Sequence, residues 1–546
     1  MKASLRPVPA PLVTTKDPFA LYTPAYTPPS SPLPPAKVLS PNLTIIHTND
    51  IHAHMDSFSE HGTECSDQEI ASYTCYGGAA RLHTVVERLR KEHPNALLFD
   101  AGDQFQGTMY YTHYKGSITA EFMNEMMRYD LTTLGNHEFD DGPEHLADFL
   151  GLLKFPVVTS NMNVTKHPRL SKVIRPYHLF PEHGLAVIGF ITNTTGYISN
   201  SGPDITFPDA IPIVQQHIND IRDLGYQRII AVSHNGYKED QYVASQTSGL
   251  DLIVGGHSHT YLSPDLEEKN PLSKGLYPTR VTGKDGEDTY VVQAYKWGQY
   301  VGHLDLEFTP EGRIASISGQ PINVNNTIKA DPPTLARVAQ WREAFETENR
   351  VVIGNVTQAY SFDECRETEC EIASFMCDVI LKHRRPSGSQ GCILHGGAVR
   401  SGFNKGNITV GHIRTMLPFG DHIMDVELSG SKLYETVENA IEGHRQDTGE
   451  KIATTLQTSG FEIQYDPKAP AYQRIRSLRI LESYLGDQET YQITTVQFIT
   501  VGGDGLLRGD FKEHDTQDDL AAVIRSYITK HSPLTFPVPG KRIQTV

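Results

Sequence analysis

The chain has 546 residues and a formal net charge of -17. That length is enough for more than one domain, each with its own core. The acidic balance argues against a protein that binds polymeric nucleic acid, which needs a basic face, but a small nucleotide held through metal ions remains a possible ligand.

The first 41 residues predict a Pro-rich, disordered N-terminal segment. They include the run from Thr23 to Pro35, in which proline recurs every few residues, and such a composition stays extended without a packed core. This segment lacks the apolar stretch of a secretory leader. We expect no transmembrane segment, since no run reaches about 20 apolar residues, and no lipid-anchor signal at the C-terminus.

From Leu43 onward the hydrophobic pattern alternates between strand and helix. Short apolar runs predict strands at 43–50, 96–103, 157–160, 185–191, 229–233 and 252–255. An amphipathic helix is predicted between the first two strands by the helical spacing of Leu82, Val85, Val86 and Leu89. Strands that alternate with helices predict α/β layers.

Five short polar motifs each follow an apolar run, so each is expected at the carboxyl end of a buried strand. They supply Asp50, His52, Asp103, Asn136, His137, His234, His257 and His259. Ligands bind at this edge of open α/β sheets. Oxygen and imidazole ligands together suit two divalent metals about 3.5–4 Å apart, which clamp the oxygens of a phosphoryl displacement. A single His is more often an ordinary polar residue, but five such motifs favour a metal-dependent phosphoester hydrolase.

The sequence Ala330-Asp-Pro-Pro predicts the start of a helix that runs to about Asn349, because proline is tolerated in a first helical turn. Beyond it the composition changes. We therefore expect residues 42–329 to form one domain, 330–350 to form an inter-domain helix and 351–546 to form a second domain.

The six cysteines fall in two clusters without the close pairs of a zinc knuckle: Cys65, Cys75, Cys365, Cys370, Cys377 and Cys392. An even number favours three local disulfides and an oxidising compartment, with six buried thiols as the alternative. N-glycosylation sequons support a secreted or cell-surface location: Asn42, Asn163, Asn193, Asn325, Asn355 and Asn407.

Four motifs have specific amino-acid sequences: Thr48-Asn-Asp-Ile-His, Asp100-Ala-Gly-Asp-Gln-Phe-Gln-Gly, Gly135-Asn-His-Glu-Phe-Asp and Gly255-Gly-His-Ser-His. They closely resemble the calcineurin-like metallophosphoesterases, and more narrowly the 5'-nucleotidase family. The resemblance covers about residues 43–535. It implies an α/β protein with a four-layer α/β/β/α metallophosphoesterase domain, joined by a helix to a C-terminal α+β domain that binds the nucleotide. A homodimer is compatible with it.

The resemblance also implies roles for individual residues. One metal would be held by Asp50, His52, Asp103 and His259, and the other by Asp103, Asn136, His234 and His257. Zinc is the expected ion, with manganese, cobalt or magnesium as alternatives. His137 and Asp140 resemble a catalytic dyad, and Arg81 is interpreted as structural. The implied disulfides are Cys65–Cys75, Cys365–Cys370 and Cys377–Cys392.

The second domain is expected to select the leaving group. Residues that resemble the family's nucleoside pocket are Arg366, Arg400, Phe419, Phe498 and Asp504. Without the resemblance these would be ordinary salt-bridge and core residues. His395 stands where the family usually has asparagine, and an imidazole cannot reproduce the paired donor and acceptor of an amide. Base preference is therefore open.

The resulting hypothesis is a zinc-dependent 5'-nucleotidase that hydrolyses nucleoside 5'-monophosphates. Two alternatives stay open at this point. One is an apyrase-like or UDP-sugar hydrolase, since only the pocket decides which phosphorus meets the metals. The other is a secreted nucleotide-binding protein without catalysis, which the complete set of predicted metal ligands disfavours.

Overall fold

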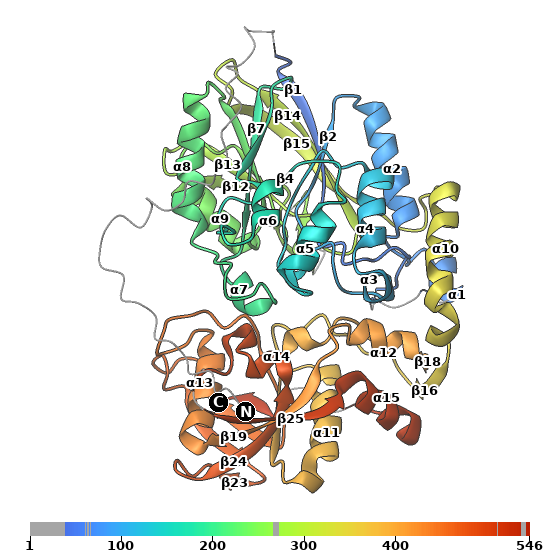
Figure 1. Ribbon diagram of the computed structural model, residues 1–546, viewed down its shortest axis with the longest axis vertical. Coiled ribbons are helices and arrows are strands. Elements are labelled where there is room, and N and C mark those ends of the chain that lie inside the picture. The colour runs from blue at the N-terminus through green and yellow to red at the C-terminus, as the bar shows by residue number, and fades with distance from the viewer. Residues whose placement is uncertain are drawn as a thin grey trace.

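The computed structural model describes residues 39–60, 62, 65, 67–265, 272–509, 511–536 and 542–546. Residues 1–38 of the predicted Pro-rich segment lie outside this set. The N-terminal and C-terminal parts of the chain lie at opposite ends of the long axis, with helix α10 (Pro332–Asn349) along one side (Figure 1). Among the described residues, no helix combines the length and apolar character needed to cross a membrane.

The first large sheet of the N-terminal part has seven strands. The strands β1 to β5 run parallel to one another, while β14 and β15 add antiparallel strands at one edge. In spatial order they are β15 (Ile314–Asn323), β14 (Tyr300–Phe308), β1 (Asn42–Thr48), β2 (Leu97–Asp100), β3 (Leu131–Thr133), β4 (Val157–Val158) and β5 (Ile174–Arg175).

The second large sheet has six strands and a parallel centre. In spatial order they are β12 (Thr279–Thr282), β13 (Asp288–Val292), β9 (Leu252–Val254), β8 (Arg228–His234), β7 (Leu185–Ile191) and β6 (Tyr177–Phe180). The two sheets share one apolar core that includes Ile45 and Phe99 from the first and Val187 and Ile230 from the second. They therefore pack face to face.

Helices cover the outer face of each sheet. Helix α2 (Ala79–Glu92) buries the predicted stripe of Leu82, Val85, Val86 and Leu89 in a core with Ile46 of β1 and Leu98 of β2. On the other side α8 (Ala210–Asp223) and α9 (Tyr237–Gln246) pack on the second sheet. The order helix, sheet, sheet, helix gives the four predicted layers (Figure 1).

Helix α10 (Pro332–Asn349) leads from the N-terminal part to the C-terminal part. It starts where the sequence predicts, because Asp331 caps it by accepting a hydrogen bond from the Thr334 backbone N–H. Trp341 and Phe345 are buried against the N-terminal core. The helix contacts α2 and α12 (Val410–Met416), so it touches both parts of the molecule.

The C-terminal part mixes helices with mainly antiparallel sheets. Its five-stranded sheet has the order β20 (Leu456–Ser459), β17 (Gly391–His395), β24 (Thr490–Val496), β19 (His422–Ser429) and β25 (Lys512–Asp519). Helices α11 (Glu371–Arg384), α13 (Gly430–Glu442) and α15 (Leu520–His531) pack on it. A smaller sheet contains β23 (Ser483–Tyr484), β22 (Ile475–Ile480), β21 (Phe461–Tyr465) and β26 (Ile543–Thr545).

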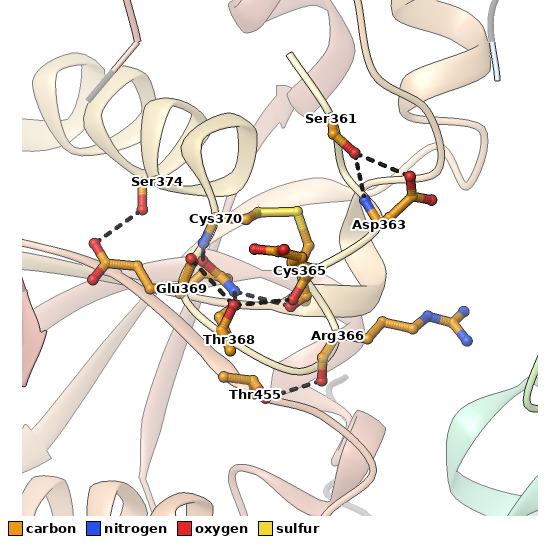
Figure 2. The surroundings of a disulfide bond; sticks show 12 residues. Ser361, Asp363, Cys365, Arg366, Thr368, Glu369, Cys370, Ser374 and Thr455 are labelled. Atoms are coloured by element: carbon orange, nitrogen blue, oxygen red, sulfur yellow. Dashed lines mark hydrogen bonds between the residues drawn. A yellow bond between two sulfur atoms is a disulfide. The ribbon is translucent and has the colours of Figure 1, made fainter. Parts of the chain in front are cut away.

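Two of the three expected disulfides are present, Cys65–Cys75 and Cys365–Cys370, the second shown in Figure 2. The expected Cys377–Cys392 disulfide is wrong, since both residues are buried free thiols. Their sulfur atoms are 3.0 Å apart, whereas a disulfide needs about 2.05 Å. The Cys392 thiol donates to the Cys377 sulfur, which donates to the Gln457 carbonyl at 3.3 Å. Burial and the neighbouring Cys377 raise the pKa of Cys392, so it stays protonated.

Candidate functional site

The carboxyl ends of the parallel strands bring the predicted metal ligands together. Asp50 and His52 follow β1, Asp103 follows β2, and Asn136 follows β3 in the first sheet. His234 ends β8, and His257 and His259 follow β9, in the second sheet. Because the sheets pack face to face, both sets of strand ends open toward the same space.

Several of these residues adopt a left-handed backbone. The φ angles of Asp50, Asp103, His257 and His259 are 51°, 56°, 76° and 49°. Such angles are uncommon for residues with side chains and cluster at functional sites. Gly135 is required nearby, since a Cβ there would lie 2.2 Å from Oδ1 of Asp103.

One group of three possible ligands is Asp50, His52 and His259. Nε2 of His259 lies 3.2 Å from Oδ1 of Asp50 and 3.2 Å from Nε2 of His52. The ligand atoms of all three lie within 4.8 Å of one another. Oδ2 of Asp103 is 3.7 Å from Nε2 of His52, which places the predicted bridging carboxylate beside this group.

A second group consists of Asp103, His234 and His257, whose ligand atoms also lie within 4.8 Å of one another. Nε2 of His234 is 3.1 Å from Oδ2 of Asp103. The same nitrogen is 3.9 Å from Oδ1 of Asp50. The two groups are therefore adjacent, with the Asp103 carboxylate of the second group 3.7 Å from His52 of the first.

The donor set fits a pair of metal ions. Oδ1 of Asn136 and Nε2 of His234 are buried, and neither has a hydrogen-bond partner within the described part of the chain. Buried polar atoms normally find a partner. Nδ1 of His234 donates to the Ala101 carbonyl at 2.6 Å, and Nδ1 of His52 donates to the Phe105 carbonyl at 2.8 Å. In the neutral ring each Nε2 is then unprotonated, as a metal ligand requires.

The two groups of three and Asn136 are called the metal cluster below. The charges around these seven residues favour a bound cation. Burial lowers the pKa of His52 and His257, so both imidazoles are neutral. Burial also acts to lower the pKa of His234, but the neighbouring Asp103 and Asp50 outweigh it and raise the pKa to about 10. The carboxylates thus draw positive charge to this point, and a divalent ion can supply it in place of a proton.

His137 and Asp140, which the sequence predicts to act as a dyad, lie within hydrogen-bond distance of each other. Nδ1 of His137 lies 2.7 Å from Oδ2 of Asp140, three residues along the same turn. The backbone N–H of His137 donates to Oδ1 of Asp103 at 2.9 Å. The imidazole ring lies 5.3 Å from that of His52, measured between centroids. His137 therefore sits beside the metal cluster without belonging to either group of three.

Glu138 has a role that the sequence analysis missed, although it lies inside a quoted motif. This buried carboxylate accepts hydrogen bonds from the backbone N–H groups of Asp103, Gln104, Phe105 and Gly135 at 2.6 to 3.2 Å. It thus fixes the loops after β2 and β3 that carry Asp103 and Asn136. Burial and the adjacent Asp103 raise the pKa of Glu138 to about 7.

A cavity of about 500 Å³ joins the metal cluster to the C-terminal part. From the cluster it is lined by Asp103, Asn136, His257 and His259, together with His137 and Asp140. All six predicted substrate residues also line it: Arg366, His395, Arg400, Phe419, Phe498 and Asp504. The two predicted halves of the site thus face one space.

Arg400 and Phe419 reach across to the N-terminal residues. Nη2 of the buried Arg400 is 3.4 Å from Nε2 of His52. Burial, reinforced by the nearby Arg366, lowers the pKa of Arg400 to about 9. The ring of Phe419 stacks on His137, with centroids 5.8 Å apart. Positive charge therefore lies beside the metal cluster, in the lining of the cavity.

His395 and Asp504 form a pair in the lining of the cavity. Nδ1 of His395 lies 2.8 Å from Oδ2 of Asp504, and its ring lies 4.7 Å from that of Phe498. Nε2 of His395 is buried and has no hydrogen-bond partner among the described residues. Asp421, another residue missed from sequence, accepts from the Phe498 backbone N–H at 3.3 Å and so supports that ring.

Arg366 and Arg81 differ in their surroundings: the first lines the cavity, and the second is buried away from it. Arg366 extends away from the Cys365–Cys370 disulfide, while its carbonyl accepts from Thr455 Oγ1 at 2.9 Å (Figure 2). The short disulfide loop thus holds the backbone that presents this guanidinium. Arg81 is buried and donates to the Cys75 carbonyl at 3.1 Å, which agrees with its structural interpretation.

Comparison with known proteins agrees with this arrangement. Residues 43–261 match the calcineurin-like phosphoesterase family, and residues 352–509 match the 5'-nucleotidase C-terminal domain. A 5'-nucleotidase of Rattus norvegicus is 34% identical over 527 residues, which cover 91% of this chain and 90% of that protein. Snake venom 5'-nucleotidase of Naja atra is 34% identical over 531 residues, or 92% and 98% of the two chains.

A solved structure is similar over the same extent. The 5'-nucleotidase precursor from Thermus thermophilus has a TM-score of 0.84 at 30% identity, covering 92% of this chain and 99% of its own. The similarity spans both parts of the molecule and both family domains. The chain therefore belongs to the 5'-nucleotidase family, whose members are hydrolases of the calcineurin-like phosphoesterase superfamily.

Proposed function

We propose that this protein hydrolyses nucleoside 5'-monophosphates to nucleoside and inorganic phosphate. The observation that carries the proposal is one cavity of about 500 Å³ whose lining combines the metal cluster with aromatic and arginine side chains. A nucleotide has the matching parts, a phosphate at one end and a flat base at the other.

The proposed metal ligands are the two groups described above, with Asp103 as the bridge and Asn136 added to the second group. We propose zinc, since imidazole and carboxylate ligands suit it, while manganese, cobalt or magnesium would use the same oxygens. When bound, two such ions stabilise the charge of an in-line phosphoryl displacement and activate the attacking water.

His137 is proposed to act on the phosphoryl group. Its Nδ1–H donates to the Asp140 carboxylate, which holds the ring in place and leaves Nε2 available to the substrate. With a proton on Nε2 as well, the ring is a donor toward the substrate. His137 can then donate to a phosphoryl oxygen or to the departing 5'-oxygen as negative charge develops there.

The C-terminal side chains are proposed to bind the rest of the nucleotide. Arg366 and Arg400 would donate to the phosphate, a geometry that guanidinium groups favour. Phe419 and Phe498 would stack on the base, each contributing about 1–3 kcal/mol. The Nε2 of His395 would accept a hydrogen bond from the nucleoside, because its Nδ1–H is engaged by Asp504.

Phosphate release from AMP by the zinc-loaded protein tests the proposal. Asp103→Ala removes the shared carboxylate and is the negative control. We expect turnover by the wild-type protein and none by the variant. Rates on AMP that do not exceed those of the control would overturn the proposal. Higher rates on ADP, ATP or UDP-glucose than on AMP would show that the preferred substrate is a nucleoside diphosphate, a nucleoside triphosphate or a UDP-sugar.

We also propose that the protein acts outside the cell. Two disulfides support this location, since they persist in oxidising compartments. Three of the six sequon asparagines, Asn42, Asn193 and Asn407, are exposed and accessible to glycosylation. Glycosidase treatment of the protein recovered from culture medium should lower its apparent mass.

A further inference from the structure

Four polar side chains gather on the first sheet at a distance from the cavity. His93 directly follows α2, while His303 and Asp305 lie two residues apart on β14 and so share one face of that strand. Thr44 of β1 is the cross-strand partner of Asp305. These four residues are called the His93 cluster below.

The spacing of the possible ligand atoms is close to that of a metal site. Nδ1 of His93 is 3.6 Å from Oδ1 of Asp305, and Nε2 of His303 is 3.6 Å from Oδ2 of Asp305. The ligand atoms of these three residues all lie within 4.8 Å of one another. Tetrahedral zinc with ligands at about 2.0–2.1 Å has its ligand atoms about 3.3–3.5 Å apart.

His303 has a nitrogen that the fold leaves unused. Its Nε2 is buried but has no hydrogen-bond partner in the part of the chain that the structure describes. The Asp305 carboxylate lies 3.6 Å from this nitrogen. A buried imidazole nitrogen normally has a bonding partner. A cation bound between Nε2 of His303 and the Asp305 carboxylate would be such a partner.

Thr44 orients the carboxylate. Its Oγ1 donates to Oδ1 of Asp305 at 2.6 Å and lies 3.1 Å from Nδ1 of His93. Since its one proton goes to Asp305, the hydroxyl accepts from His93 in the metal-free state. Metal binding at Nδ1 requires the proton to move to Nε2 of the same ring. Hydrogen-bonded carboxylates of this kind are typical of the shell around metal ligands.

The His93 cluster is accessible from solvent. The side chains of His93, His303 and Asp305 are 31%, 17% and 45% exposed. An ion can therefore enter, and water can complete its coordination. Two imidazoles and one carboxylate are a ligand set used by zinc sites that keep an open position.

We propose that His93, His303 and Asp305 bind a divalent transition ion of the zinc class, with Thr44 orienting the carboxylate. The site is separate from the proposed dimetal centre. His303 pairs with Ile46 in the β1–β14 ladder, and Ile46 lies four residues before Asp50. Because a strand rises about 3.3 Å per residue, the two sites are about 13 Å apart along the chain direction. The bound ion joins the end of α2 to β14 and so stabilises the N-terminal part.

Zinc content tests the proposal. The full-length protein is stripped with a chelator, reloaded with zinc and passed through a desalting column before elemental analysis. The variants are His303→Gln with Asp305→Asn, the single change His93→Gln, and His113→Gln as a control at an exposed histidine. We expect the wild-type protein and the control to hold one zinc more per chain than either cluster variant, with AMP hydrolysis equal in all four.

A second readout is thermal unfolding. Zinc added after the higher-affinity sites are filled should raise the melting temperature of the wild-type protein and the control but not of the cluster variants. Equal zinc content in all four proteins would overturn the proposal. So would an extra zinc that is lost on the desalting column, since that indicates adventitious binding only. If AMP is not hydrolysed but the zinc difference persists, the cluster proposal stands and the proposed function fails.

Discussion

His137 is the side chain for which the structure suggests the sharpest kinetic test. It lies beside the metal cluster and under Phe419, so its removal leaves the metal ligands and the base pocket in place. We predict that His137→Ala lowers kcat for AMP by about 100- to 10,000-fold with little change in KM. The measurement is steady-state kinetics at matched zinc content. A change confined to KM would contradict the proposed role.

The partner of His137 makes the activity depend on pH. Burial raises the pKa of Asp140, in spite of the opposing effect of His137. As the pH falls through this raised pKa, the carboxyl takes up a proton and loses the negative charge that holds Nδ1–H of His137. We predict that kcat declines on acidification at a higher pH than an ordinary aspartate would give. Asp140→Asn should have a lower kcat and a flatter acid limb, with zinc content measured at each pH.

The base pocket should affect binding more than turnover. We predict that Phe419→Ala and Phe498→Ala each raise KM for AMP by about 5- to 150-fold, which corresponds to about 1–3 kcal/mol for one stacked ring. His395→Asn should change the ranking of AMP, GMP, CMP and UMP by KM, because an amide can both donate and accept. An unchanged ranking would show that Nε2 of His395 does not contact the base.

The loops after β2 and β3 depend on one buried carboxylate. In Glu138→Gln, two backbone N–H groups would face an amide NH2 group in place of an oxygen atom. Each unsatisfied buried group costs about 1–3 kcal/mol, so we predict a loss of about 2–6 kcal/mol in unfolding free energy and weaker zinc retention. Glu144→Gln on α5 (Pro143–Leu150), where the side chain is 74% exposed, is the control with a change below about 0.5 kcal/mol.

Much of the α/β framework could be predicted because its strands are short apolar runs with polar residues at their ends. The stripe from Leu82 to Leu89 predicted α2, and Asp331 with two prolines predicted the start of α10. Strands β14 and β15 were not predicted. In β14 buried and partly exposed residues alternate, and this pattern is weaker than a continuous apolar run. Their omission also hid the His93 cluster.

Contacts made at long range could not be predicted from local patterns. The bonds from Glu138 to the loop after β2 span more than 30 residues, so the motif marks the residue but not its partners. The state of Cys377 and Cys392 depends on a difference of about 1 Å between two sulfur atoms in a packed core. The ligand roles of Asp50 and its companions remain predictions until metal is measured.

The two parts of the chain meet at the site itself. Arg400 from the C-terminal part approaches His52 from the N-terminal part, and Lys296 bonds to Asp363 at 2.9 Å across the same boundary. We predict that Arg400→Ala lowers kcat/KM for AMP by about 10- to 150-fold, as expected for the loss of a charged hydrogen bond worth about 1.5–3 kcal/mol. Arg414→Ala, which breaks a peripheral pair with Glu348, should leave kcat/KM unchanged.

The central claim is that strand ends from two sheets seat two neighbouring cations next to a nucleotide pocket. Anomalous scattering from crystals of the zinc-loaded protein tests it most directly. The account predicts two peaks about 3.5–4 Å apart, one among Asp50, His52 and His259 and one among Asp103, His234 and His257. A map without a peak at either position, from protein that is folded and saturated with zinc, would contradict it.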